Sequence, residues 1–234
     1  MTNAMDKLEK YLSERDEIKN VDTRLLREVA YDRLQDAIKH AGLQPGEPLS
    51  ETRISRALGI SRTPVREAIQ RLAKEGLVQV IPGRAITVAA PSMQEVLDAL
   101  HVRELLEPEV VRLAATTLPA KEREILQNLT AEMEQVARAG DRPAWTKFDT
   151  NWHEILSHSC PNRLLGQLVL QARNRMYNRG AAEQVSAQYI VNGTLEHKQV
   201  VEAILASDGE AAEQLMREHI RNVRENMFKR LARY

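Results

Sequence analysis

The segment from Leu49 to Val88 constrains the fold more than any other part of the sequence. Its apolar residues recur at helical spacing before Gly59 and again up to Gly76, and these two glycines end short helices. Beyond them, apolar residues alternate on either side of Pro82-Gly83-Arg84, which predicts a two-stranded hairpin. Two helices joined by a tight turn and followed by a hairpin predict a winged helix-turn-helix, whose second helix enters the major groove of DNA.

The second of these predicted helices separates its apolar and charged residues. One face is apolar and is expected to pack inward, whereas another sector carries Arg62, Thr63 and Arg66. Between Arg53 and Arg84 the chain holds seven basic residues against two acidic ones, an excess of five positive charges in a protein of zero formal net charge. Arginine binds guanine edges and phosphates through paired hydrogen bonds. The segment is therefore a candidate polyanion site, although solvated helix faces are often equally basic.

The run SETRISRALGISRTPVREAIQRLAKEGLV and the Pro-Gly-Arg hairpin tip closely resemble the DNA-binding domain of GntR-family bacterial transcription regulators. The resemblance implies that five residues contact operator DNA, namely Arg53, Arg62, Thr63, Arg66 and, in the wing, Gly83 near the minor groove. In many relatives the wing tip reads Gly-Arg-Gly, whereas here alanine follows the arginine. Because operator symmetry mirrors protein symmetry, a homodimer on a short palindromic operator in double-stranded DNA is expected.

A domain boundary is expected at Pro91-Ser92. We predict a charged N-terminal extension over residues 1–20 with no assignable chemistry, a DNA-binding domain over 21–90 and a second domain over 91–234. In the second domain, helical periodicity predicts six helices, at about 93–116, 120–138, 142–158, 162–179, 183–206 and 209–230. The expected fold class is mainly α, a winged helix-turn-helix followed by an all-helical bundle.

Polar residues of the kinds that bind metals interrupt the apolar stripes of three predicted helices. Asp149 and His153 lie one turn apart on a stripe that includes Trp145 and Trp152, and His197 and His219 stand among apolar residues on two later helices. An unpartnered buried carboxylate or imidazole costs on the order of a few kcal/mol, so these groups are expected to meet. One carboxylate and three imidazoles suit zinc, nickel, iron or manganese. Two plainer interpretations stay open, because core histidines are often only hydrogen-bonded and Asp149 can simply pair with His153.

The region from about 93 to 230 resembles the FCD ligand-binding domain found in the FadR branch of the GntR family. There, an Asp-x-x-x-His pair, a Glu-His on a later helix and a final-helix histidine bind a metal. Asp149, His153, His197 after Glu196, and His219 match all four positions. The resemblance therefore implies a divalent metal ion as cofactor, zinc before nickel, manganese or iron. Six helices instead of seven place the chain nearer the VanR-like subgroup than FadR itself.

Arg103 lies on the apolar stripe of the first helix of this domain, one turn before Glu107. In metal-binding relatives an arginine on this helix holds the carboxylate of a small organic acid beside the metal. Arg103 is therefore the candidate effector-binding residue, and a small organic acid is the expected effector. The alternative is an intrahelical ion pair with Glu107. Arg173 and Arg175 are weaker candidates for the same pocket.

Together these features predict a DNA-binding transcription regulator, expected to be a repressor, whose operator affinity depends on a carboxylate metabolite bound at a metal-containing pocket. One rival makes the metal a structural element or the signal itself. A second rival is a DNA-tethered metalloenzyme, but no separate general base or nucleophile accompanies the four ligands, so no enzymatic activity is expected. The charged N-terminus and the lack of an apolar run near the roughly 18 residues of a membrane helix favour a cytoplasmic location.

Overall fold

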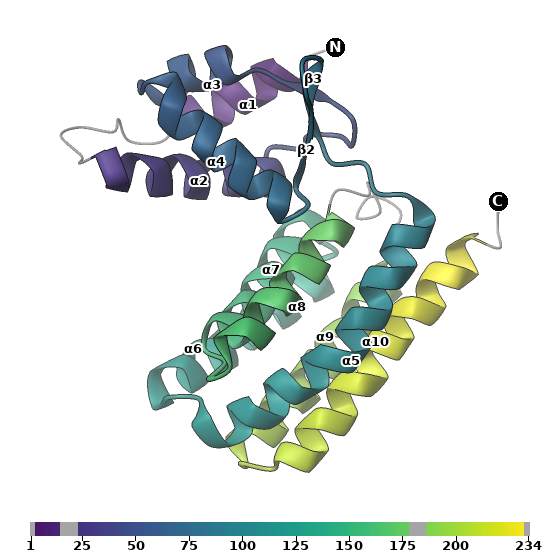
Figure 1. The fold of residues 1–234 in the computed structure, drawn as a ribbon. Coiled ribbons are helices and arrows are strands. Elements are labelled where there is room, and N and C mark those ends of the chain that lie inside the picture. Colours follow the sequence, from purple (N-terminus) through teal and green to yellow (C-terminus); the bar gives the residue numbers. More distant parts are fainter. Residues whose placement is uncertain (1–2, 15–22, 178–185, 232–234) are drawn as a thin grey trace. The chain divides into compact units, whose positions relative to one another are not determined.

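The computed structural model describes residues 3–14, 23–177 and 186–231, and within them the chain is mainly helical (Figure 1). It divides into two compact units: the first comprises the described residues up to Ser92 together with 174–177, and the second comprises the other described residues from Met93 onward. The predicted helix break at Gly180 and the predicted helix start near residue 183 lie outside the described residues. In the described part of the chain, no helix has the length and apolar character needed to cross a membrane.

The first unit contains four helices and a small sheet. Its elements are α1 (Ala4–Ser13), α2 (Thr23–His40), β1 (Pro48–Leu49), α3 (Glu51–Leu58), α4 (Arg62–Lys74), β2 (Val78–Ile81) and β3 (Ala85–Val88). The strands are antiparallel in the order β1-β3-β2, with Val78 opposite Val88 and Leu49 opposite Ile86. The helix pair and the hairpin confirm the predicted winged helix-turn-helix. Strand β1 was not predicted, because two residues are too few to form a pattern.

Capping explains where α3 and α4 begin. Ser50 accepts a hydrogen bond from the amide of Arg53, and α3 ends at Gly59 with a φ of 67°. Ser61 occupies the N-cap position of α4, but its side chain makes no capping hydrogen bond. An N-cap side chain accepts from the second or third helical amide, and the third residue of α4 is Pro64, which has no N–H. The start of α4 is therefore set by its proline and its packing.

Helix α1 belongs to the core of the first unit, although the sequence indicated a charged extension with no assignable chemistry. Four of its residues are at most 4% exposed, and they join the same apolar cluster as residues of α2, α3 and α4: Ala4, Met5, Leu8 and Leu12. The helix packs on α2, α3 and β1. The apolar spacing at positions 5, 8 and 12 is the signal that the charge of this segment concealed.

The second unit is a bundle of six helices among the described residues, as predicted. They are α5 (Met93–Thr117), α6 (Ala120–Ala139), α7 (Arg142–His158), α8 (Arg163–Tyr177), α9 (Ala187–Leu205) and α10 (Gly209–Leu231). Helices α5 and α10 run side by side, α9 packs on both α6 and α10, and α6 also packs on α7 (Figure 1). Side chains that are completely or almost completely buried fill the interior, including Leu100, Leu126, Met133, Trp152 and Ile190.

One glycine fixes how α8 meets α7. A Cβ atom at Gly166 would lie 2.1 Å from the backbone oxygen of Ser157, a distance that no side chain tolerates. The absence of a side chain therefore lets the start of α8 approach the end of α7. This approach places α8, with Arg173, beside the helix that carries Asp149 and His153.

Candidate nucleic-acid interface and metal centre

Three residues that were predicted to contact DNA lie exposed in the first two turns of α4. Arg62, Thr63 and Arg66 are all accessible, and each arginine side chain is 58% exposed. Both guanidinium groups share one carboxylate, since Glu51 Oε2 lies 2.9 Å from Arg66 Nη2 and 3.3 Å from Arg62 Nη2. Hydrogen bonding from Arg66, and then from Arg62, lowers the pKa of Glu51 below its usual value. One carboxylate thus orients two cations that stay open to solvent.

Arg53 has different surroundings from the other two arginines. Its Nε and Nη2 atoms donate to the two carboxylate oxygens of Glu9 at 2.6 Å each, and Nη2 also donates to Asp6 Oδ1 at 2.7 Å. Both acids belong to α1, and the Arg53 side chain is 34% exposed. Sequence reasoning did not predict this contact, because it joins residues more than forty positions apart.

Gly83 lies at the exposed tip of the hairpin formed by β2 and β3. Its φ is 68°, in the left-handed region that favours glycine. The amide of Arg84 donates to the carbonyl of Ile81 at 3.0 Å and closes the turn. The wing therefore presents a glycine and an exposed arginine at its end.

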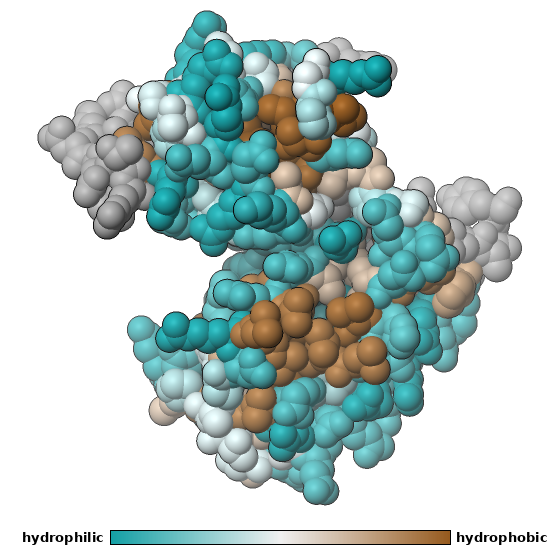
Figure 2. All heavy atoms as spheres, viewed as in Figure 1, coloured by the Kyte–Doolittle hydropathy of each residue, from teal (hydrophilic) through white to brown (hydrophobic). Residues whose placement is uncertain are grey.

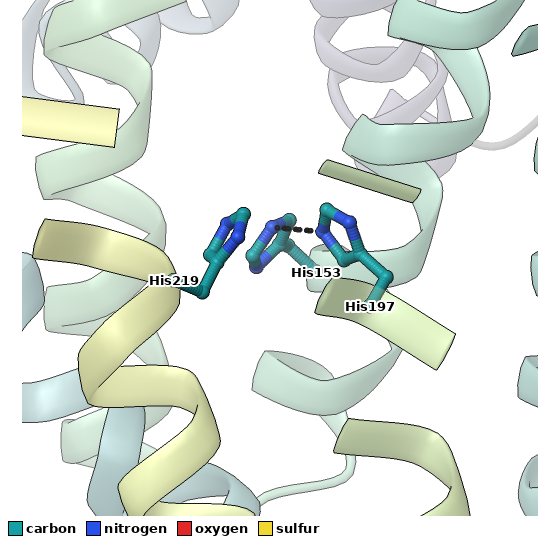
Figure 3. Close-up of side chains that lie close together, drawn as sticks. All are labelled: His153, His197 and His219. Atoms are coloured by element: carbon teal, nitrogen blue, oxygen red, sulfur yellow. Dashed lines mark hydrogen bonds between the residues drawn. The ribbon is translucent and has the colours of Figure 1, made fainter. Parts of the chain in front are cut away.

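The three histidines singled out in the second unit meet in its interior. His153 of α7, His197 of α9 and His219 of α10 point toward one another (Figure 3) and are 2%, 1% and 5% exposed. The Nε2 atoms of His153 and His197 are 3.1 Å apart. One nitrogen from each ring can be chosen so that all three lie within 4.8 Å of one another, which suits a shared metal ion.

The second nitrogen of each ring faces an acceptor. His197 Nδ1 lies 2.6 Å from the carbonyl oxygen of Gly193, and His219 Nδ1 lies 2.7 Å from Glu196 Oε2. His153 Nδ1 lies 3.0 Å from Glu107 Oε2. Carbonyl and ionised carboxylate oxygens only accept, so the Nδ1 atoms of His197 and His219 carry the proton, and the Glu107 carboxylate beside His153 favours the same tautomer there. In the neutral rings Nε2 then carries a lone pair, and partners of this kind are typical of metal-ligating histidines.

The imidazole rings of His153 and His197 face each other with their unprotonated nitrogens. Two Nε2 lone pairs at 3.1 Å repel each other unless a positive charge lies between or beside them. Metal–nitrogen bonds to imidazole are about 2.0–2.1 Å long, so two ligand nitrogens roughly 3 Å apart can share one ion. The donor set therefore fits a divalent metal ion better than a network of hydrogen bonds alone.

Asp149, the fourth residue of the ligand set that the resemblance implied, lies beside two of the histidines. Its Oδ1 atom lies 3.4 Å from His197 Nε2 and 3.7 Å from His153 Nε2. Its other oxygen, Oδ2, accepts a hydrogen bond from Arg173 Nη2 at 3.0 Å. Since Arg173 occupies only one oxygen, the second is directed toward the histidines. The residue keeps 20% of its side chain exposed, so this end of the site is the more open one.

Arg103 forms the intrahelical ion pair that was the alternative to effector binding. Its Nε atom donates to Glu107 Oε1 at 2.5 Å, and the two side chains are 7% and 3% exposed. Arg173 Nη1 lies 3.7 Å from the same carboxylate oxygen. Glu107 therefore links both arginines to His153. Of the two weaker candidates, Arg173 lies at the site, whereas Arg175 is exposed.

Burial and neighbouring charges set the protonation states of the site. Burial, with Arg173 nearby, lowers the pKa of His153 to about 4, and burial together with His219 lowers the pKa of His197 well below its usual value. Burial alone would raise the pKa of Asp149, but Arg173 and the imidazoles outweigh it and hold that pKa below the ordinary value. At neutral pH His153 and His197 are therefore neutral and Asp149 is ionised, as metal ligation requires.

Sequence reasoning missed two members of this site. Glu107 was considered only as a partner of Arg103, and Glu196 only as the neighbour of His197. The structure places Glu107 against His153 and Glu196 against His219. Helical spacing predicts contacts along one helix, but these two pairs join different helices. A carboxylate on an apolar stripe, as at position 107, is the one signal that indicated a buried partner.

Comparison with known proteins agrees with both units. The family described as "Bacterial regulatory proteins, gntR family" matches residues 26–88, and the FCD domain matches residues 98–222. The HTH-type transcriptional repressor RspR of Escherichia coli is 28% identical over 200 residues, which cover 84% of this chain and 86% of that protein. A probable D-xylose utilization operon transcriptional repressor of Paenarthrobacter nicotinovorans is 27% identical and covers 78% and 80% of the two chains.

Solved structures support the same fold. E. coli McbR/YncC superposes with a TM-score of 0.77 at 22% identity, over 91% of this chain and all of that one. A GntR regulator from Rhodococcus gives a TM-score of 0.68 at 23% identity, over 88% and 99% of the chains. Fold, family matches and relatives lead to one conclusion: the chain belongs to the GntR family of bacterial transcription regulators, with an FCD domain as its C-terminal part.

Proposed function

We propose that the first unit binds operator DNA through Arg53, Arg62, Thr63 and Arg66, with Gly83 of the wing at the minor groove. The support is the exposure of the two α4 arginines. Each is 58% exposed, so a DNA phosphate can take the place of their shared partner, Glu51. The N-terminal residues of a recognition helix are those that reach base edges in this motif. By this proposal the unit binds a specific duplex and represses transcription.

The second unit, by this proposal, holds a divalent metal ion, zinc in the first place, through Asp149, His153, His197 and His219. The single observation that carries it is the convergence of three buried histidines, which can bring one nitrogen each within 4.8 Å of one another while the Nδ1 atom of each ring lies beside an acceptor. A bound ion would supply a fixed positive charge and an open coordination position for a ligand. The protein's own groups hold the histidines in the required tautomer and keep the Asp149 carboxylate ionised.

The charge count around the centre favours an anionic effector. Arg103 and Arg173 contribute two positive charges, whereas Asp149, Glu107 and Glu196 contribute three negative ones, which leaves one negative charge with neutral imidazoles. A divalent ion changes this to one positive charge in a largely buried site. One carboxylate group restores neutrality, so a small organic acid is the ligand class that we assign. Arg173, and Arg103 behind it, would stabilise that carboxylate.

Helix α5 offers the covalent route from effector to DNA. It follows strand β3 of the wing in the chain and also carries Arg103 and Glu107. An effector that binds one arrangement of this helix more tightly than another shifts the population of DNA-binding states by that difference in affinity. The proposed regulator is thus a repressor whose operator affinity changes when the carboxylate binds.

A homodimer is part of the same proposal. Exposed large apolar side chains are frequent on the second unit, and Figure 2 shows apolar groups gathered on one of its faces. The most exposed are Leu105, Leu164, Leu195 and Phe228, at 48–64%. Apolar patches of this kind mark association surfaces, and a two-fold dimer matches a palindromic operator.

The metal is tested by elemental analysis and native mass spectrometry of wild type, His197→Ala and His101→Ala. His101 is an exposed histidine of α5 outside the centre, so its variant is the matched control. We expect one ion per chain in wild type and His101→Ala, and loss of the ion in His197→Ala. Wild-type protein without metal, after purification with zinc and nickel available, would contradict the metal proposal.

DNA binding is tested with a duplex selected by the wild-type protein from a random pool. Its affinity is measured with zinc, with a chelator, and with zinc plus mono-, di- and tricarboxylic acids. A change that requires both zinc and an acid supports the carboxylate sensor. A change with zinc alone favours the metal as the signal, and equal affinity under all conditions would contradict regulation through this site.

A further inference from the structure

Helix α1 brings two carboxylates onto an arginine of the proposed DNA-binding surface. Glu9 accepts two hydrogen bonds from Arg53 at 2.6 Å each, and Asp6 accepts a third at 2.7 Å. This helix lies before residue 26, where the match to the GntR family begins. Three carboxylate oxygens around one guanidinium resemble the oxygens that a DNA phosphate would offer.

The position of the two acids is fixed by the local structure of α1. Asn3 caps the helix, and the second oxygen of Asp6 accepts a hydrogen bond from the Asn3 amide at 3.3 Å in a capping box. Glu9 follows Asp6 by three residues and therefore lies on the same face of the helix. The Asp6 side chain is thus positioned by the cap, with its other oxygen left for Arg53.

The helix itself is firmly attached. Met5, Leu8 and Leu12 are at most 4% exposed in the core of the first unit, and the Tyr11 hydroxyl donates to Asp36 Oδ2 of α2 at 2.7 Å. The acidic side of α1 therefore stays beside Arg53. Hydrogen bonding from Arg53 lowers the pKa of both Asp6 and Glu9, so both are ionised at neutral pH. The carboxylates occupy the Nε–Nη2 edge of the guanidinium, so a DNA phosphate can bind that edge through two hydrogen bonds only if they release it.

We propose that Asp6 and Glu9 lower the DNA affinity of this regulator by competing with the operator for Arg53. The inference rests on the proposed role of Arg53 in DNA binding. In the wild-type protein an Arg53–phosphate contact replaces an Arg53–carboxylate contact, so the net gain is small. Two carboxylates that have lost their partner then also face the negative field of the duplex. The acids therefore set the affinity without changing the residues that contact DNA.

Salt dependence distinguishes this competition from a general charge effect. An arginine that is free before binding displaces condensed cations from DNA, and each phosphate contact contributes about 0.9 to the slope of log affinity against log salt. When a carboxylate must first release the arginine, the freed carboxylate attracts cations from solution. This uptake offsets the cations that the arginine displaces from DNA, so the salt slope is smaller. Removing the competing acid is therefore expected to raise the affinity at low salt and to steepen the slope by up to about 0.9.

The test compares Glu9→Gln with Glu14→Gln in the full-length protein. Both substitutions remove one negative charge near the same helix, but Glu14 contacts Lys10 at 3.9 Å and is 62% exposed. Binding to the selected duplex is measured by fluorescence anisotropy over a salt series, and thermal unfolding checks that both variants are folded. We expect Glu9→Gln to bind about three- to fivefold more tightly than Glu14→Gln, as for an exposed ion pair.

A double-mutant cycle with Arg53→Ala isolates the route of the effect. In the Arg53→Ala background, Glu9→Gln should have no more effect than Glu14→Gln, because the competed group is gone. Equal affinities of Glu9→Gln and Glu14→Gln in the wild-type background would overturn the proposal. Weaker binding by Glu9→Gln would overturn it as well, since the acid would then position Arg53 for DNA. If wild-type protein selects no duplex, the DNA-binding proposal itself fails, which is a separate result.

Discussion

Arginine–carboxylate pairs occur both in the winged helix-turn-helix unit and in the helical bundle, but their exposure differs. In the first unit, Arg62 and Arg66 are each 58% exposed and share the carboxylate of Glu51. In the second unit, Arg103 and Glu107 are 7% and 3% exposed, and Glu107 also faces His153 and Arg173. The same kind of ion pair therefore has exposed arginines in the first unit and is buried in the core of the second unit.

The difference in exposure decides what each pair can do. An exposed pair contributes little to stability, since water and ions replace either partner, so its arginines are available for phosphates. A buried pair cannot lose one partner without leaving a charge in a low-dielectric interior, so its members stay in place. Exchangeable pairs suit a surface that binds DNA, and fixed pairs suit a site that must orient three histidines.

The largest effect is expected for Glu107→Gln. This substitution leaves the guanidinium groups of Arg103 and Arg173 with one carboxylate fewer and replaces the charged group beside His153 Nδ1 with a neutral amide. We expect the free energy of unfolding to fall by about 3–5 kcal/mol, as for a broken buried ion pair. Urea unfolding of the metal-free proteins measures it.

The matched control for that substitution is Glu109→Gln, two residues further along α5. Glu109 also pairs with an arginine through both oxygens, at 2.6 and 2.7 Å from Arg112, but it is 40% exposed. Its loss should cost less than about 1 kcal/mol. If the two variants lose similar free energies of unfolding, burial does not determine how much these ion pairs contribute to stability.

The second prediction is that removal of the proposed metal ion destabilises the buried site. An ion present at about 100 times its dissociation constant stabilises the folded state by about 2.7 kcal/mol, so a chelator should lower the melting temperature by several degrees. His197→Ala should melt at the same temperature with and without the chelator, whereas Arg66→Ala should respond like wild type. Calorimetric or spectroscopic melting curves decide this. Equal sensitivity of wild type and His197→Ala would place the ion elsewhere.

The third prediction concerns the exposed region. Arg66→Ala should weaken binding to the selected duplex by about tenfold and reduce the salt slope by about one unit, with little change in melting temperature. Arg71→Ala is the control, because Arg71 lies on the same helix but stacks 3.6 Å from the centre of the Tyr31 ring. We expect Arg71→Ala to retain DNA affinity. If both variants lose the same DNA affinity, binding depends on general positive charge and not on the face of α4 that carries Arg66.

Most of the fold could be predicted from local sequence signals. The apolar spacing, the glycine at position 59 and the proline breaks gave the helices and the hairpin to within a few residues. Ser61 stands at the N-cap position of α4 but makes no capping hydrogen bond, and Pro64, the third residue of the helix, provides no amide for one. The two-residue strand β1 has no local pattern, and it exists through its pairing with β3.

The site was predictable where its residues follow a spacing and not where they come from distant helices. The one-turn spacing of Asp149 and His153 and the histidines on apolar stripes indicated groups that meet inside the bundle. The partners Glu107 and Glu196 were not predicted as such, because contacts between helices depend on packing that the sequence alone does not specify. Likewise, the charges of α1 suggested a solvated extension, and its contact with Arg53 needed the tertiary structure.

The smallest effect is expected for Gly83→Ala, at the tip of the wing. Its φ is 68° and a Cβ atom would meet nothing within 4 Å, so the cost is backbone strain of about 1 kcal/mol. Gly140→Ala in the second unit is a matched control, with a φ of 72° and equally open surroundings. Both variants should lose similar stability in urea unfolding, but only Gly83→Ala should also weaken DNA binding, because its methyl group would stand where the proposed interface places the minor groove. Unchanged DNA affinity in Gly83→Ala would mean that this glycine serves the turn alone, and the proposed interface would then be limited to α3 and α4.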